Sequence, residues 1–169
     1  MIAALLLAGL TGGLLDPPAI APVSVAKTAA VVSDPLNGVL TPKAIPGAAV
    51  DYTITVSNTS NRVLDDGTIA VADLVPVKAK LYVKDLGLAG SGPVAFSQNL
   101  LSGVSYSYTS LASATDDLAF SKDGGVTYTY VPVPDADGCD ALVTHVRARP
   151  RGALSITGVF AVRFRVVVR

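Results

Sequence analysis

The sequence predicts an all-β fold, an antiparallel β-sandwich that follows an apolar N-terminal extension. Two observations carry this prediction. Apolar and polar residues alternate in several short stretches, which is the pattern of strands that bury one face. Glycine, proline, asparagine and aspartate separate these stretches about every ten residues, as the turns of a sandwich do. Beyond the apolar start, no stretch has the periodicity of an amphipathic helix.

The composition describes one domain of 169 residues with balanced charge. Thirteen Lys and Arg match 13 Asp and Glu, so the formal net charge is zero and no field attracts nucleic acid or an acidic membrane. Hydrophobic residues make up 50% and charged residues 15%, which leaves the chain poorly protected against self-association. The single cysteine, Cys139, excludes an internal disulfide.

Residues 1–21 form an apolar N-terminal segment, and the sandwich is predicted over residues 22–169. The apolar run from Met1 to Leu15 is stopped by Asp16-Pro17-Pro18. A signal peptide is one interpretation, because Ala19-Ile20-Ala21 has the small-residue pattern of a cleavage site. Against it, no Lys or Arg precedes the apolar core. The run is too short for a membrane span, which needs about 20 residues.

A retained, subunit-linking segment is the other interpretation. Seven large apolar side chains each gain about 1.5–3 kcal/mol on burial, or roughly 10–20 kcal/mol together. Ordering about fifteen residues costs as much, at ~1.5 kcal/mol each. The segment therefore needs nearly complete burial, which a closed sandwich leaves to another copy of the chain. These interface residues are Ile2, Leu5, Leu6, Leu7, Leu10, Leu14 and Leu15.

The first strand is predicted over residues 24–32, and the central strand follows at Val50–Asn58. β-branched and aromatic residues fill the central strand, and turn residues precede and follow it. Its polar face begins with Asp51. Its core-facing residues are Val50, Tyr52, Ile54 and Val56.

Shorter alternating stretches predict the remaining strands. They cover residues 68–74, 81–83, 94–96 and 105–109. The clearest hairpin joins residues 118–121 to residues 126–131 through Lys122-Asp123-Gly124-Gly125. Residues 143–149 form a further strand, and residues 160–169 close the chain. In the closing strand we expect these side chains to face inward: Phe160, Val162, Phe164, Val166 and Val168.

Residues 43–58, KAIPGAAVDYTITVSN, resemble the core of the DUF11 repeat domains (conserved repeat domains) of exported bacterial surface proteins, which share a P-G-x-x-V-x-Y-T-I-T-V-x-N pattern. Residues 120–128 and 143–147 resemble further motifs of relatives of that group, and the resemblance covers residues 24–169. It implies an immunoglobulin-like sandwich, export and a non-enzymatic structural role. It implies no catalytic residue.

One loop has the residue types of a metal site. Asp135, Asp137 and Asp140 surround Gly138, and clustered oxygen ligands on a flexible loop suit Ca²⁺. The spacing is too short for an EF-hand, so solvated turn residues are the alternative, and no other cofactor is expected. Cys139 lies among these acids, which disfavour a thiolate. A packed free thiol or a disulfide between chains is expected there.

Two other groups have binding potential. Four tyrosines have rings that stack on sugars or pack in the core, namely Tyr106, Tyr108, Tyr128 and Tyr130. Six arginines form a basic stripe for an anionic polysaccharide if the last strands pair, or otherwise a solvated face, namely Arg147, Arg149, Arg151, Arg163, Arg165 and Arg169. The only histidine, His145, has no marked orienting acid or oxyanion site, so no enzyme is expected.

These features lead to two hypotheses about function. In the first, the chain is a structural subunit of an extracellular fibre or pilus-like polymer, and its apolar segment packs into a neighbouring copy. In the second, it is a monomeric secreted adhesive or binding module of the bacterial cell surface, with residues 1–21 removed as a signal peptide. The expected partners are copies of the chain itself, without nucleic acid and without a stable membrane span.

Overall fold

The computed structural model describes residues 23–169, in which every regular element is a β-strand. The predicted all-β class with antiparallel sheets is confirmed for this part of the chain. In residues 23–169 no helix is long and apolar enough to cross a membrane. The predicted interface residues lie outside the described residues, namely Ile2, Leu5, Leu6, Leu7, Leu10, Leu14 and Leu15.

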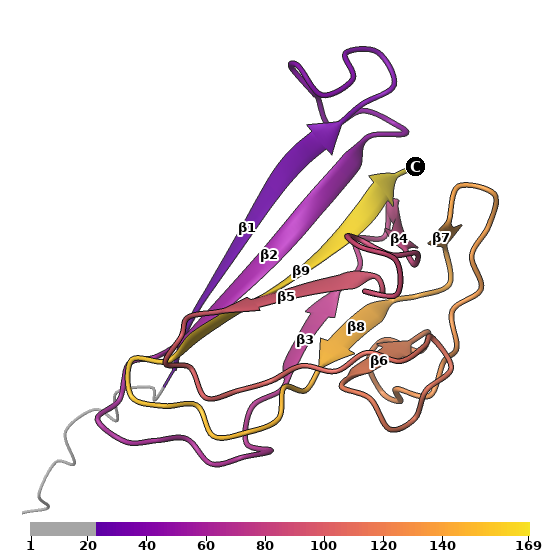
Figure 1. Ribbon diagram of the computed structural model, residues 1–169. Helices are drawn as coiled ribbons and strands as arrows, with labels where there is room; N and C mark the ends of the chain where they lie inside the picture. Colours follow the sequence, from indigo (N-terminus) through magenta and orange to yellow (C-terminus); the bar gives the residue numbers. More distant parts are fainter. Residues whose placement is uncertain (1–22) are drawn as a thin grey trace, which may run out of the picture.

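The larger sheet has six strands and forms one layer of the molecule (Figure 1). Five strands follow the order β1-β2-β9-β4-β7. The sixth strand, β5, pairs with the same edge of β9 as β4 does, at different residues. The bounds are β1 Val23–Ser33, β2 Ala49–Asn58, β4 Ala79–Tyr82, β5 Val94–Gln98, β7 Cys139–Asp140 and β9 Val159–Val168.

The smaller sheet has three strands in the order β3-β8-β6. They are β3 Val71–Leu74, β8 His145–Ala148 and β6 Leu118–Ser121. In β8, Val146 and Ala148 are buried while His145 and Arg147 are only partly buried, as expected of a strand with one face on a core. The smaller sheet therefore forms the second layer.

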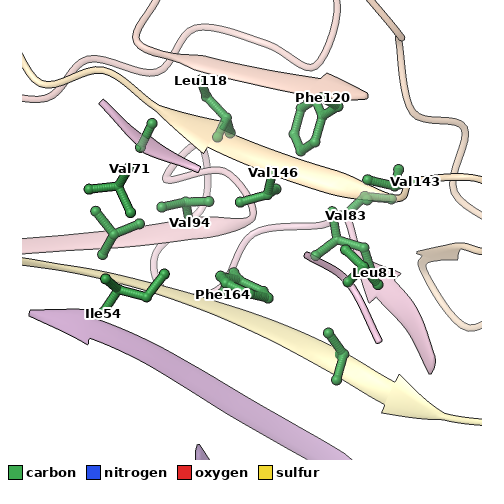
Figure 2. Packing of buried hydrophobic residues seen from close by; sticks show 14 of the residues in the cluster. Ile54, Val71, Leu81, Val83, Val94, Leu118, Phe120, Val143, Val146 and Phe164 are labelled. Carbon is green, nitrogen blue, oxygen red and sulfur yellow. The ribbon is translucent and has the colours of Figure 1, made fainter. Parts of the chain in front are cut away.

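The core fills the space between the two sheets. Figure 2 shows Ile54 and Phe164 of the larger sheet facing Val146 and Leu118 of the smaller one. The largest fully buried side chains are Phe120, Phe160 and Phe164, and they pack among a majority of aliphatic side chains. This apolar layer fixes the two sheets against each other and thereby positions the loops and edges around them.

Strand β9 is the centre of the larger sheet. Along one edge, residues 159–167 pair with residues 49–57 of β2. Along the other edge, residues 160–164 pair with β5 and residues 166–168 with β4. Its inward residues alternate with Arg163 and Arg165, which point to the opposite face, because successive side chains of a strand alternate.

The central strand β2 also has the expected alternation. Val50, Ile54 and Val56 are buried, and Tyr52 is half-buried with its ring stacked on that of Phe164, 5.6 Å between centroids. Asp51 departs from the pattern, because it is buried although it lies on the polar face.

The prediction of a hairpin over residues 118–131 is wrong for its second strand. Residues 126–131 contribute one bridge, from Tyr130 to Phe120, and β6 pairs instead with β8. The Asp123 carboxylate accepts hydrogen bonds from the backbone N–H and the hydroxyl of Thr127, at 2.9 and 2.6 Å. These bonds hold a tight loop that carries the chain away from a ladder with β6.

The predicted strand of residues 105–109 is reduced to a single bridge between Ser105 and Arg151. The N–H of Ser107 donates to the Asp117 carboxylate at 2.7 Å, so it cannot form a hydrogen bond with a neighbouring strand. The Tyr106 ring stacks on Phe96 at 5.3 Å, so this segment is held by side-chain packing.

Candidate functional site

Strand β1 is a long and open edge of the larger sheet. It has 11 residues and pairs only with β2, whereas the other edge strands of the described part have five residues or fewer. Figure 1 shows β1 at the outer edge of this sheet. Every side chain from Ser24 to Ala30 is exposed. A strand with one free edge presents unpaired N–H and C=O groups to any chain that can lie beside it.

The inner face of β1 is uncovered because the smaller sheet stops at β3. Val25 pairs with Val56 and faces the core side, yet its side chain remains 61% exposed. Below it, a groove of about 440 Å³ runs between the two sheets. Most of its walls are apolar and come from Val23, Val25, Ile54, Val56, Leu64, Ile69 and Val71.

An ion pair crosses from β1 to the smaller sheet beside this groove. Lys27 projects from the inner face of β1, and its Nζ lies 2.6 Å from an Asp73 carboxylate oxygen on β3. The same Nζ lies 4.7 Å from the centre of the Tyr52 ring. An inward-pointing charge is one device by which edge strands limit unwanted pairing. Here it lies near a groove whose lining contains no charged residue.

This arrangement combines two kinds of binding surface. The free edge of β1 offers backbone hydrogen bonds, and the groove offers burial to apolar side chains on one face of an added strand. Most residues of β1 are small, with Ala at positions 26, 29 and 30, and none is proline. A strand of another chain can therefore approach closely along most of its length.

The three loop carboxylates that suggested a calcium site face different partners. Asp135 and Asp137 both accept hydrogen bonds from Lys80 Nζ, at 2.7 and 2.9 Å. Asp140 accepts from the hydroxyl of Tyr130 at 2.8 Å and from the N–H of Val133 at 2.8 Å. No group of three metal-ligating side chains gathers anywhere in residues 23–169. The hydrogen bonds that Lys80 donates to Asp135 and Asp137 raise the pKa of Lys80, so this ammonium stays charged and occupies the carboxylate oxygens.

The arginines do not form a single stripe. A single basic stripe requires that the last two strands of the chain pair with each other, but β8 and β9 belong to different sheets. Arg163 and Arg165 of β9 hold Asp51. Arg151 binds Asp117 at 2.6 Å. Arg147 of β8 lies over the Tyr128 ring, 3.9 Å from its centre.

Within the described part of the chain, Cys139 and His145 contact only groups of the fold itself. Cys139 is fully buried, and burial raises the pKa of its thiol. A disulfide between chains is not compatible with this burial, so the packed free thiol is the outcome. His145 Nδ1 lies 3.3 Å from the Thr144 hydroxyl.

Sequence reasoning missed the two sides of the groove. Lys27 is the only charged residue of β1, and an isolated lysine on the inner face of an apolar strand is a signal for an edge. Asp73 carries no such signal, because its meeting with Lys27 depends on how the sheets stack. Comparison of the chain with protein-family models, curated proteins and solved structures finds no match.

Proposed function

We propose that the chain is a non-enzymatic structural subunit of an extracellular, pilus-like homopolymer of the bacterial surface. The free edge of β1 and the groove beneath it accept the apolar segment, residues 2–15, of a neighbouring copy. The observation that carries the proposal is an 11-residue edge strand whose inner face is left uncovered. The resemblance of residues 43–58 to exported repeat domains remains a prediction and agrees with this location.

The composition of the segment matches the groove. Residues 2–15 contain no charged residue, and the groove is mostly apolar. In an extended strand, residues of equal parity share a face. One face then carries Ile2, Leu6, Leu10 and Leu14, with only Ala or Gly between them. Large side chains spaced by small ones suit a groove that is bounded by a neighbouring strand.

The connector favours a neighbour over the chain's own groove. Residues 16–22 join the apolar segment to Val23, which itself lines the groove. To lie along its own β1, the segment has to reverse direction within these seven residues. Three of them are proline, at positions 17, 18 and 22. Proline-rich linkers extend at about 3.1 Å per residue and resist such a reversal.

The proposal is tested by comparing the full chain with a chain that lacks residues 1–21. We expect filaments of the full chain in negative-stain micrographs and a void-volume peak in size-exclusion chromatography. The shortened chain is expected to elute as a monomer and to bind a synthetic peptide of residues 2–15 in a 1:1 ratio. A monomeric full chain, or filaments of both chains, contradicts the proposal.

A point substitution tests the acceptor surface in the full chain. Val25→Lys places a charge in the groove at an exposed position, so it leaves the core intact and is expected to abolish filaments. Val126→Lys introduces the same charge at an exposed loop position outside the groove and is expected to leave them unchanged. Equal assembly of both variants locates the contact elsewhere.

A monomeric secreted binding module is the second candidate, because Tyr128, Arg147 and Arg149 line one hollow on the smaller sheet. Mass spectrometry of the secreted protein distinguishes the two functions. A mature chain that begins near Pro22 favours the binding module, and retention of residues 2–15 favours the polymer.

A further inference from the structure

A hollow of about 320 Å³ lies over the outer face of the smaller sheet. Its floor includes Ala119 of β6 and Arg147 of β8, which pair in the sheet and point away from the buried Val146 and Ala148. Its rim is formed by the loops of residues 111–117 and 128–131. The hollow is thus separate from the groove beside β1.

The hollow contains two arginines without a counter-ion. Within residues 23–169, neither Arg147 nor Arg149 takes part in an ion pair. The Nε of Arg147 is buried and has no hydrogen-bond partner in the described part of the chain. A buried donor without a partner costs free energy, which a bound acceptor removes.

The two carboxylates that line the hollow already accept hydrogen bonds from residues other than Arg147 and Arg149. Asp117 binds Arg151 at 2.6 Å and accepts from a backbone N–H at 2.7 Å. Asp116 accepts backbone N–H groups, of which Thr109 is the nearest at 2.9 Å. Burial, and then the charge of Arg149, lower the pKa of Arg147, so a nearby anion would favour its charged form.

Aromatic and hydroxyl groups complete the walls. The Tyr128 ring lies against the Arg147 guanidinium, and the Tyr130 ring is fixed by its hydroxyl on Asp140. Thr129 and Ser113 add hydroxyls to the rim. A pocket that combines aromatic rings with hydroxyl and carboxylate acceptors suits a sugar ring, because the faces of the sugar are apolar and its edge donates hydrogen bonds. Guanidinium groups bind carboxylates through charge-assisted hydrogen bonds.

We propose that this hollow binds a carboxylated sugar, a uronic acid unit. The carboxylate accepts hydrogen bonds from Arg147 Nε and from Arg149, and the sugar ring lies against the tyrosines. The proposal does not depend on assembly, because no residue of the hollow lines the groove. It names the ligand of a second site on the same chain.

Saturation-transfer difference NMR tests this with the full chain, since the method works for monomers and polymers alike. D-Glucuronate is the probe, and D-glucose and inorganic phosphate are the comparison ligands. We expect saturation of glucuronate protons, no effect for glucose, and no displacement of glucuronate by equimolar phosphate. Binding of glucose with equal strength, displacement by phosphate, or no signal for glucuronate overturns the proposal.

Three substitutions assign the binding to the hollow. Arg149→Gln removes an exposed cation and is expected to weaken glucuronate about tenfold, as the loss of one charge-assisted hydrogen bond does. Arg147→Lys keeps the charge but loses the Nε donor, and we expect a similar loss. Arg62→Gln removes an exposed arginine that does not line the hollow and serves as the matched control. Equal weakening by Arg62→Gln and Arg149→Gln reduces the effect to net charge and contradicts the site.

Discussion

The carboxylate of Asp51 lies 2.6 Å from Nε of Arg165, directly across the ladder between β2 and β9. Arg163 Nη1 reaches the same carboxylate, also at 2.6 Å. The two guanidiniums cover Asp51, whose side chain is only 5% exposed, on the outer face of the sheet. A charged residue is thus sealed at the centre of the larger sheet by two partners from one neighbouring strand.

Replacing Asp51 by Asn is expected to reduce the free energy of unfolding by about 1.5–3 kcal/mol at pH 7, the range for hydrogen bonds to charged groups. Burial opposes the charge, but the hydrogen bonds and charges of Arg165 and Arg163 outweigh it and lower the pKa of Asp51 below 3.8. The stabilisation is therefore complete above the unfolded pKa and is lost as the pH falls through the folded one.

Urea unfolding at pH 7 and at pH 3 measures this effect. The difference between wild type and Asp51→Asn shrinks at the lower pH. Asp65→Asn, which changes an exposed carboxylate, is the control and is expected to have little effect at either pH. A difference that stays constant with pH argues against an ionised Asp51 as the source of stability.

A second buried polar residue joins the end of β2 to a distant turn. The Asn58 amide nitrogen donates to the carbonyls of Arg62, Leu154 and Ser155, at 2.8, 3.1 and 3.0 Å. Asn58→Ala removes this donor, and we expect the free energy of unfolding, measured by heat or urea, to fall by about 1–3 kcal/mol. Asn61→Ala, at an exposed position of the turn that directly follows β2, is the control. Equal stability of the two variants contradicts the role of the amide.

Thr157 is the only residue besides glycine with a positive φ, 61°, among those that the structure describes. A β-branched side chain in the left-handed region costs about 1–2 kcal/mol. Asparagine tolerates this conformation, so Thr157→Asn is expected to raise the free energy of unfolding by about 0.5–1 kcal/mol. Thr157→Val keeps the β-branch and should bring no gain. Calorimetry of the three proteins compares them, and a stabilising valine refutes the argument.

The thiol of Cys139 is expected to react slowly in the native protein. The side chain is fully buried, and its raised pKa leaves little thiolate at neutral pH. Labelling with a maleimide should be about 100-fold slower or more than in denaturant, because it requires local opening. In the double variant Cys139→Ala, Ala136→Cys, the thiol moves to an exposed position of the same loop. Equal rates for the two native proteins contradict the burial.

Strand positions could be predicted from the sequence where the period of two is long. Residues 50–58 and 160–168 alternate over many positions, and the structure has strands there with the expected faces. Residues 126–131 alternate as well, but Asp123 holds Thr127 and turns the chain away. A local side-chain bond of this kind competes with a ladder, and periodicity does not detect it.

The binding surfaces depend on contacts between distant residues. Arg147 and Tyr128 were separately recognised as residues with binding potential, yet their meeting depends on the pairing of β6 with β8 and on the bridge that joins Tyr130 to Phe120. Asp51 was assigned to the polar face, which is correct, but its burial needs arginines more than 100 residues away. The open inner face of β1 is a property of the sheet stacking and has no sequence signal beyond Lys27.

The place of β9 in the larger sheet sets an order of events during synthesis. Among residues 23–169 it is the last of nine strands and yet separates β2 from β4 and β5. Until the ribosome has delivered it, the β1–β2 ribbon has no third strand to join, and Phe160 and Phe164 are missing from the core. The nascent chain therefore stays open until β9 is available, and pairing between strands so far apart in the sequence is a slow step of folding.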